Sequence, residues 1–332
     1  MPDPQGAESV ETTVSATRSL RQRGILSARF GDRVFKWTTL LFAACVLIVT
    51  ALLAYLLLAD SLPAIREFSW GFLWGRTWDP VHDSFGALPF VYGTVVSSAL
   101  ALLLAVPISL GAAVFLAELA PVWLRNPLSF LVELLAAVPS VVYGIWGVFV
   151  LVPVLRPLEI WLGMHMGSVP LFSGAPYGIG MLAAGLILAI MVLPIITAVS
   201  RDVLRAVPVS QREAAYALGA TRWEAIRGPV FQYARAGILG AVILGLGRAL
   251  GETMAVTMVI GNTPTISASI FDPAYTMPSV LANEFMEATG KLHIAALMEI
   301  ALLLFVVTIA INAIARLLIW SVARRTHETV RE

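Results

Sequence analysis

Long apolar stretches follow one another along this chain, separated by polar segments. Six of them reach about 20 residues, the length a helix needs to cross a hydrocarbon core of about 30 Å. In lipid each backbone polar group needs a partner within the protein, so these stretches are predicted to be helices, with Pro107 and Pro139 kinking a helix or marking its end. The alternating strands of a β-barrel are not seen. The six predicted spans are Thr38 to Leu58, Leu88 to Leu116, Leu128 to Val152, Gly178 to Val199, Ala236 to Ile260 and Ile294 to Val322.

Composition supports a fold that is all-α and integral to the membrane, with six transmembrane helices. Hydrophobic residues make up 58% of the 332 positions and charged residues only 13%, unlike any ordinary soluble domain. The chain contains no G-x-x-x-x-G-K-[ST], H-E-x-x-H or C-x-x-C motif. We therefore expect no catalytic residue, no cofactor and no metal site in this chain, and any ATP hydrolysis would come from another protein.

Basic residues are distributed unevenly between the two sides of the predicted membrane domain. One side holds both termini, the loop between the fourth and fifth spans and Arg125, and it carries most of the Lys and Arg residues. The other side carries only Arg66, Arg76, Arg156 and Lys291. Since short cytoplasmic loops carry the excess of basic residues, both termini are predicted to be cytoplasmic. The net charge of +1 gives no indication of nucleic-acid binding.

These assignments divide the chain into five segments. The stretch from Met1 to Thr17 lacks apolar periodicity and is predicted to be disordered. The segments are a basic cytoplasmic tail at 1–36, a first transmembrane helix at 37–60, an extracytoplasmic loop at 61–87, a core of five transmembrane helices at 88–322 that includes a cytoplasmic loop at 200–235, and a cytoplasmic tail at 323–332.

The cytoplasmic loop contains the sequence PVSQREAAYALGATRWEAIRGPV. Ser210 with Glu213, and Thr221 with Glu224, have the spacing of two capping boxes, each of which starts a helix. Gly219 between them suits the left-handed position that ends a helix. Two short helices with a sharp turn are therefore predicted, the first with alanines that allow another protein to approach closely.

The motif E-A-A-x-x-x-G within this loop, formed by Glu213, Ala214, Ala215 and Gly219, resembles the coupling loop of permease subunits of binding-protein-dependent ABC importers. The resemblance implies the type I permease architecture and a surface that docks a cytoplasmic ABC ATPase dimer. Without the resemblance, Glu213 would be interpreted as a capping residue only.

Three further stretches are similar to the phosphate-specific branch of this family, and to its C-type permease subunit. They are FGALPFVYGTVVSS at 85–98, VPSVVYGIWGVFVL at 138–151 and LGLGRALGETMAVTMVIGN at 244–262. The resemblance implies ATP-driven import of inorganic phosphate across a prokaryotic plasma (inner) membrane by alternating access. It also implies a second, related permease subunit in a heterodimer and an extracytoplasmic phosphate-binding protein.

The stretch GRALGETMAV places Arg248 and Glu252 inside the fifth apolar span. Charged residues at such depth are costly, so they face the protein interior or a wet cavity and often mark a pathway. The spacing predicts a pair one helical turn apart, although the order with the basic residue first is the less favourable one. We hypothesise that Arg248 is the cationic element of an anion pathway and Glu252 its counter-charge. The alternative is a structural ion pair that fixes helix packing.

Two other functions remain open from the sequence. An importer of the same architecture could carry another oxyanion, such as sulfate, molybdate or a phosphonate. An independent channel or ion-coupled carrier would need no ATPase, and it would leave the cytoplasmic loop without a purpose.

Overall fold

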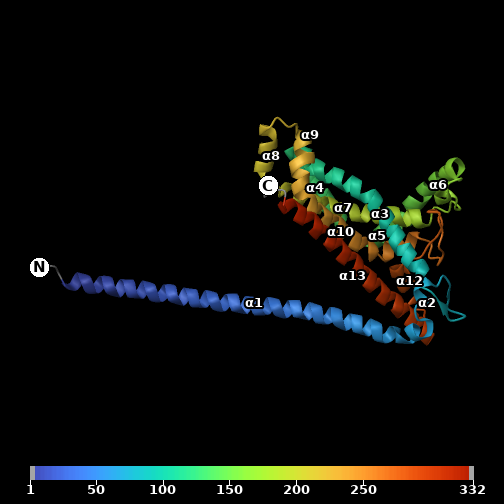
Figure 1. Cartoon of the computed structure of the whole chain (residues 1–332), viewed down its shortest axis with the longest axis horizontal. Helices are drawn as coiled ribbons and strands as arrows, with labels where there is room; N and C mark the ends of the chain where they lie inside the picture. The colour runs from blue at the N-terminus through green and yellow to red at the C-terminus, as the bar shows by residue number, and fades with distance from the viewer. Residues whose placement is uncertain (1–3, 329–332) are drawn as a thin grey trace. The chain divides into compact units, whose positions relative to one another are not determined.

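Helices account for most of the chain that the structure describes. The computed structural model describes the backbone of residues 4–328 and the side chains of residues 32–320 (Figure 1). Two compact units are distinguished, the residues up to Leu56 and those from Leu57 onward. The elements are α1 (Pro4–Phe68), α2 (Gly71–Trp74), β1 (Trp78–Asp79), β2 (Ser84–Phe85), α3 (Leu88–Val114), η1 (Phe115–Leu119), α4 (Val122–Ala136), α5 (Ser140–Trp146), η2 (Gly147–Leu151), α6 (Val152–Met166), η3 (Pro170–Phe172), α7 (Met181–Arg205), α8 (Val209–Ala217), α9 (Arg222–Ala225), η4 (Ile226–Val230), α10 (Phe231–Leu250), α11 (Met254–Val259), α12 (Met277–Glu284) and α13 (Lys291–Glu328).

Six helical segments of the described chain are long and apolar enough to cross a membrane, as the sequence predicted. Four of them lie where the apolar pattern places them, and the third and the fifth differ from their predicted positions. The six segments are Asp32–Phe68, Leu88–Leu119, Ser140–Met166, Met181–Arg205, Arg222–Leu250 and Lys291–Trp320.

The third span is displaced from its predicted position at residues 128–152. Instead α4 ends at Ala136, and the spanning segment begins only at Ser140. Pro139 lies between them in an extended conformation, with φ −59° and ψ 141°. Because proline lacks an N–H and disfavours helical backbone at the residue before it, the apolar stretch splits here. The prediction that Pro139 marks a helix end is therefore confirmed, and the prediction of one continuous span is wrong.

The fifth span is also interrupted, because α10 ends at Leu250 and α11 begins at Met254. Gly251 is a poor helix former and occupies the end of α10. Beyond it the Glu252 carboxylate accepts the backbone N–H of Ala255 at 3.3 Å, a contact that starts the next helix. The predicted single helix over residues 236–260 is therefore wrong from residue 251 onward, and the spanning segment begins earlier than predicted, at Arg222.

The amino-terminal segment differs from the expectation of disorder. The backbone of α1 is helical from Pro4, so the helix covers all of residues 1–17 except the first three, which lie outside the described residues. An α-helix satisfies its backbone hydrogen bonds within the segment and needs no apolar face to do so. The absence of periodicity therefore did not exclude helical backbone here.

The core of the second unit is built on α3, α7 and α10, which pack along one another. Small residues allow close approach: a Cβ placed on Gly185 of α7 would lie 2.5 Å from a methyl carbon of Leu100 in α3. A hydrogen bond also joins the same two helices, since the Ser109 hydroxyl donates to the Leu193 carbonyl at 3.1 Å. This packing of small residues with internal hydrogen bonds is typical of helices in lipid.

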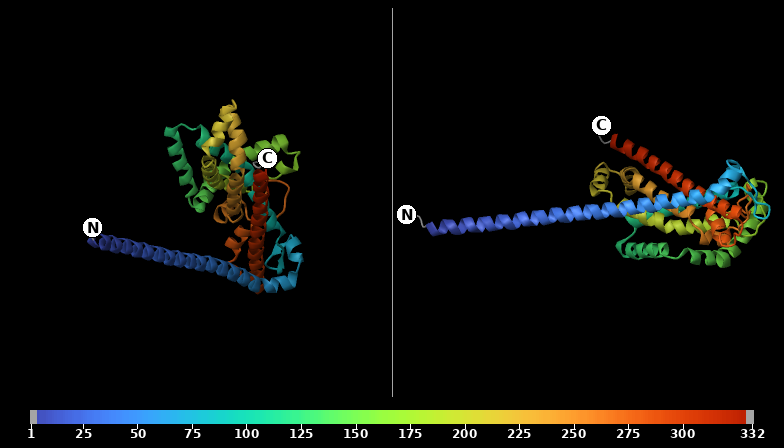
Figure 2. Two further views of the ribbon diagram at one scale, coloured as in Figure 1. Left: turned by 60° about the vertical axis from the view of Figure 1, so that its left-hand side comes forward. Right: turned by 90° about the horizontal axis from the view of Figure 1, so that it is seen from below.

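The short elements gather at two opposite ends of this helical core (Figures 1 and 2). One end carries α8 and α9, close to the last turns of α13. The other end carries α2, α12 and the small antiparallel sheet, in which Trp78 pairs with Phe85 and Asp79 with Ser84. These two ends hold the surfaces that can meet other proteins on either side of a membrane.

Candidate functional site

The first helix of the candidate coupling surface, α8, begins one residue before its predicted cap. Pro208 precedes the helix in an extended conformation, and its carbonyl accepts the N–H of Gln211 at 3.1 Å. Ser210 therefore lies within the first turn, where its side chain makes no cap hydrogen bond. The predicted capping box of Ser210 and Glu213 is wrong, because the proline fixes the start of the helix instead.

Gly219 ends α8 as predicted, in the left-handed region with φ +82°. The N–H of Gly219 donates to the Tyr216 carbonyl at 2.9 Å, and the N–H of Ala220 donates to the Ala215 carbonyl at 3.1 Å. These two bonds form a Schellman motif, which satisfies the last carbonyls of the helix. The motif reverses the chain sharply after α8.

The second capping box is confirmed at the start of α9. The Thr221 hydroxyl accepts the N–H of Glu224 at 3.4 Å, and the Glu224 carboxylate accepts the N–H of Thr221 at 2.8 Å. The two short helices and the turn between them form a protruding hairpin, residues 209–225, which we call the α8–α9 hairpin (Figure 1).

The α8–α9 hairpin presents an apolar and small-residue surface to solvent. Glu213, Ala214 and Gly219 are exposed, and Ala215 is half-buried. Leu218 is 90% exposed, and the same surface includes the exposed side chains of Val209, Tyr216 and Trp223. Exposed apolar side chains gathered in this way indicate a surface that another protein covers.

Two arginines connect the α8–α9 hairpin to the helical core by binding one residue of η1. Arg212 forms an ion pair with the Glu118 carboxylate at 2.6 Å, and both side chains are more than four-fifths buried. Arg222 donates to the backbone carbonyl of Glu118 at 2.7 Å. Arg212 also donates to the carbonyls of Val207 and Leu204, at 2.6 and 2.9 Å. These contacts join the hairpin directly to the end of the α3–η1 span.

Arg248 and Glu252 lie on either side of the break between α10 and α11. Arg248 is half-buried in the last turn of α10, where the helix dipole favours a cation. Glu252 is 9% exposed and holds the start of α11. Within residues 32–320 no hydrogen bond or ion pair joins them, so the expected pairing one helical turn apart is not formed. The spacing rule assumed a continuous helix, and the break removes that geometry.

The guanidinium of Arg248 lacks a partner at one of its buried donors. Its Nε is shielded from solvent and, in the part of the chain that is described, finds no acceptor. An unpaired buried donor is costly unless another molecule supplies an acceptor. Arg248 therefore retains capacity to bind an anion.

One side of α10 is open near its end, and the start of α11 beyond the break is exposed as well. Leu244 is 55% exposed, Gly251 is exposed, and a Cβ on Gly247 would meet nothing within 4 Å. These three positions follow helical spacing on the side of α10 that includes Arg248, and Met254 is 43% exposed where α11 begins. The packing of small residues that Gly247 and Gly251 permit is therefore available to a neighbour outside this chain.

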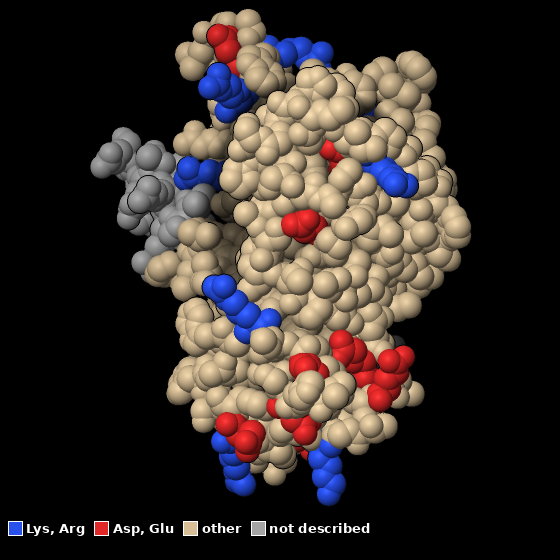
Figure 3. Space-filling view, turned by 90° about the vertical axis from the view of Figure 1, so that its right-hand side faces the viewer, with Lys and Arg blue, Asp and Glu red and all other residues tan. Residues whose placement is uncertain are grey.

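At the opposite end a cavity of 760 Å³ has acidic lining from Asp83, Glu284 and Glu287. Asp and Glu side chains gather in the lower part of the face that Figure 3 shows. The Trp78 indole N–H donates to Glu284 at 2.8 Å, and His293 lies 3.2 Å from the same oxygen. The sequence did not predict this cluster, because Trp78 and Glu284 are 206 positions apart.

The wall of the same cavity includes Tyr275. Burial raises the pKa of Tyr275 to about 12, so its hydroxyl stays protonated.

The sequence of this chain matches a known protein family. Residues 105–327 match the model of the family described as binding-protein-dependent transport system inner membrane component. The chain belongs to this family. The matched region includes the α8–α9 hairpin, Arg248 and Glu252. As a member of the binding-protein-dependent transport family, the chain is a multi-pass inner-membrane transport component.

Several curated members of the family are similar to the chain over most of its length, and each bears the name phosphate transport system permease protein PstC. A protein from Mesorhizobium japonicum is 47% identical over 96% of this chain and 99% of its own length. One from Haemophilus influenzae is 46% identical over 87% of this chain and 93% of its own. In the protein from Mycobacterium tuberculosis named PstC 2, the identity is 39% over 87% of this chain and 92% of that one.

The fold is shared with a solved transporter from the same broad class. A chain of the inward-facing MetNI methionine ABC transporter aligns with a TM-score of 0.53, covering 70% of this chain and 96% of that one. The sequence identity is 18%, so the likeness concerns the fold alone. The predicted type I permease architecture is confirmed by this likeness together with the family match.

Proposed function

We propose that this chain is a transmembrane permease subunit of an ATP-driven importer that moves inorganic phosphate across the inner membrane. The observation that carries the proposal is the identity of up to 47%, over nearly the whole chain, to proteins named for phosphate transport. The break at residues 251–253 supports it, because transporters commonly build substrate sites where a transmembrane helix is interrupted.

In this proposal Arg248 is the cationic element of the phosphate pathway. A guanidinium offers planar, paired donors that match phosphate oxygens, and here one buried donor has no acceptor among the described residues. An apolar pore without such a group would reject an anion that cannot shed its water. In this proposal the pathway runs along the open side of α10, where a second permease subunit meets this one.

Glu252 limits how tightly Arg248 holds the anion. Among the described residues no hydrogen bond or ion pair joins it to Arg248, and its carboxylate accepts the N–H of Ala255. A fixed negative charge near the cationic site opposes phosphate electrostatically, so that the anion can leave as well as enter. The role proposed for Glu252 is therefore that of a fixed counter-charge rather than a pairing partner.

Three protein partners complete the importer. A cytoplasmic ABC ATPase dimer covers the exposed side of the α8–α9 hairpin, with Glu213, Ala214, Ala215 and Gly219 at the contact. A related permease subunit covers the open side of α10 and α11 to form a heterodimer. An extracytoplasmic phosphate-binding protein delivers substrate to the end that carries the acidic cavity.

The proposed orientation follows from these partners and from the basic residues. Both termini are cytoplasmic, with tails at 1–36 and 323–332, a first transmembrane helix at 37–60 and an extracytoplasmic segment at 61–87. The hairpin end, with Arg212 and Arg222, is cytoplasmic, in agreement with the positive-inside rule.

Uptake by the reconstituted complex tests this function. Vesicles would contain this chain with its ATPase, second permease and binding protein, and phosphate and sulfate uptake would be measured with and without ATP. We expect uptake of phosphate only, and only with ATP. Uptake of sulfate, molybdate or a phosphonate in its place would keep the importer and overturn the substrate. Uptake by this chain alone without ATP would overturn the importer in favour of a carrier or channel.

A further inference from the structure

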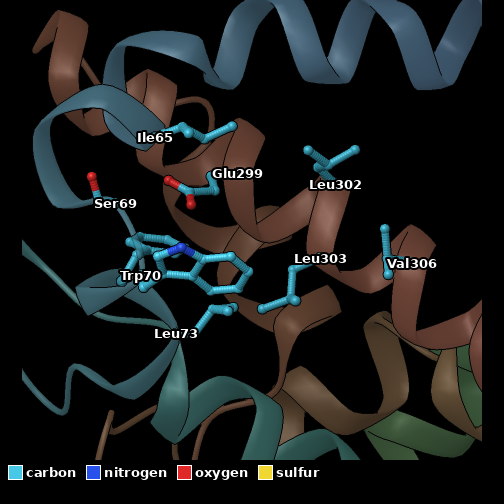
Figure 4. A pocket seen from close by; sticks show the side chains of 9 residues that line it. Ile65, Ser69, Trp70, Leu73, Glu299, Leu302, Leu303 and Val306 are labelled. Carbon is cyan, nitrogen blue, oxygen red and sulfur yellow. The ribbon is translucent and has the colours of Figure 1, made fainter.

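A second cavity, of 520 Å³, lies among helices (Figure 4). It includes residues of α2, which is at the end of the helical core opposite the α8–α9 hairpin (Figure 1). Its walls come from the last turn of α1, the turn at Ser69 and Trp70, α2, and the first half of α13. The volume lies within the range of ordinary small-molecule pockets. The lining residues are apolar apart from the Ser69 hydroxyl, the Trp70 indole N–H and one carboxylate, and they are Ile65, Ser69, Trp70, Phe72, Leu73, Glu299, Leu302, Leu303 and Val306.

Glu299 is the feature of this cavity that packing leaves unexplained. Its Oε2 is shielded from solvent, and no described residue donates a hydrogen bond to it. The side chain points from α13 toward Ser69 and the Trp70 indole, into the cavity (Figure 4). A charged oxygen in apolar surroundings needs a cation or a donor, so the cavity is incomplete as it stands.

The position of the cavity along α13 favours the depth where lipid headgroups meet hydrocarbon. Glu299 follows the start of α13 at Lys291 by eight residues, about 12 Å along the helix. Side chains lean toward the start of their helix, which brings the carboxylate closer to the membrane surface. Trp70 and Trp74 are 79% and 73% exposed beside the cavity, and tryptophan favours this interfacial level.

The apolar wall continues from the carboxylate along α13. Leu302, Leu303 and Val306 follow Glu299 at helical spacing and form the side of the cavity that leads away from the surface. A molecule that fits has a cationic, hydrogen-bonding head and an apolar tail in line with it. Phospholipids with a primary ammonium group have this form.

We propose that this cavity binds a phospholipid whose headgroup carries a primary ammonium, such as phosphatidylethanolamine. The ammonium donates to the Glu299 carboxylate, and the acyl chains lie against Leu302, Leu303 and Val306. A primary ammonium has three N–H donors, whereas the quaternary ammonium of phosphatidylcholine has none, so the site distinguishes the two lipids. Neither Arg248 nor Glu252 lines this cavity. The proposed orientation puts the cavity in the outer leaflet, and only this assignment rests on the proposed function.

Lipid retention by the assembled importer tests the site. The purified complex would be equilibrated with mixtures of phosphatidylethanolamine and phosphatidylcholine having identical acyl chains, and the bound lipid measured by native mass spectrometry. We expect the wild-type complex to prefer phosphatidylethanolamine by about tenfold, the effect of one charge-assisted hydrogen bond. Glu299→Gln should remove this preference. Leu303→Trp, which fills the cavity, should lower retention of both lipids.

Glu287→Gln is the matched control, since it makes the same change at an exposed glutamate outside this cavity. It should retain the wild-type preference. Equal retention of both lipids by the wild-type complex would overturn the proposal without the need for any variant. An unchanged preference in an assembled Glu299→Gln complex would overturn it as well, by showing that another group holds the ammonium.

Discussion

Arg248 lies in the last turn of α10, within an apolar segment, and has one buried donor without an acceptor in the described chain. We expect Arg248→Gln to assemble and to lower phosphate uptake by about 10- to 150-fold, the loss of one charged hydrogen bond of about 1.5–3 kcal/mol. Arg248→Lys keeps the charge but not the paired donors, so phosphate uptake by this variant should lie between that of the wild type and that of Arg248→Gln. The measurement is ATP-driven uptake normalised to assembled complex. Normal uptake by Arg248→Gln would remove Arg248 from the pathway and leave it a structural residue.

Gly219 is held at φ +82° by the Schellman motif, although a Cβ there would meet no other atom within 4 Å. Gly219→Ala should therefore destabilise the turn only by the free energy of a left-handed backbone at a non-glycine residue, about 1–2 kcal/mol. The population of molecules with an open hairpin turn should then increase about 5- to 30-fold. Limited proteolysis at residues 217–221 measures the opening.

The matched control is Gly228→Ala, which also meets no atom within 4 Å but lies in η4 without a positive φ. Its proteolysis should match that of the wild type or be slower. Equal rates for the two variants would contradict the strain assigned to Gly219.

Two local motifs in the α8–α9 hairpin could be predicted from sequence, because each depends on residues within one turn, whereas the predicted capping box of Ser210 and Glu213 was wrong. The capping box of Thr221 and Glu224 and the left-handed Gly219 are of this kind. The pairing of Arg248 with Glu252 failed for a related reason. Helical spacing holds only while the helix continues, and the apolar run gave no sign that the chain breaks at Gly251.

Among the elements, the contact between the α8–α9 hairpin and η1 determines whether motion of the hairpin reaches the membrane. Arg212→Gln and Glu118→Gln each remove one side of a largely buried ion pair. Each should lower phosphate uptake while ATP hydrolysis continues, because the hairpin then moves without carrying α3 with it. In a double-mutant cycle for unfolding, the two changes should show a coupling of about 0.5–3 kcal/mol.

Arg227→Gln serves as the control, since Arg227 is exposed in η4 and lies outside this ion pair. It should leave both uptake and hydrolysis unchanged. Additive effects of Arg212→Gln and Glu118→Gln on stability would show that the ion pair does not hold the hairpin in place.

The displaced third span shows what an apolar pattern cannot decide at the level of elements. Residues on both sides of Pro139 are apolar, so the pattern alone allowed a span that crossed it. The structure makes α4 a separate helix of 15 residues packed on α7, too short to cross a membrane by itself. Pro139, which divides the two elements, was visible in the sequence. Whether the residues before it or after it form the span depended on packing.

For the whole molecule, the two ends of the helical core should face opposite sides of the membrane. The chain has one cysteine, Cys45, so a Cys45→Ser background lets single new cysteines report on each end. Ser173→Cys lies at an exposed position beyond α6, and Ser210→Cys at an exposed position in α8. Because basic residues concentrate at the hairpin end, that end should be cytoplasmic. The cells are kept intact, but their outer membrane is made permeable to the reagent. A maleimide that cannot cross the inner membrane should then label Ser173→Cys. It should label Ser210→Cys only after the cells are lysed. The reverse pattern would invert the proposed orientation, and with it the side on which the ATPase docks.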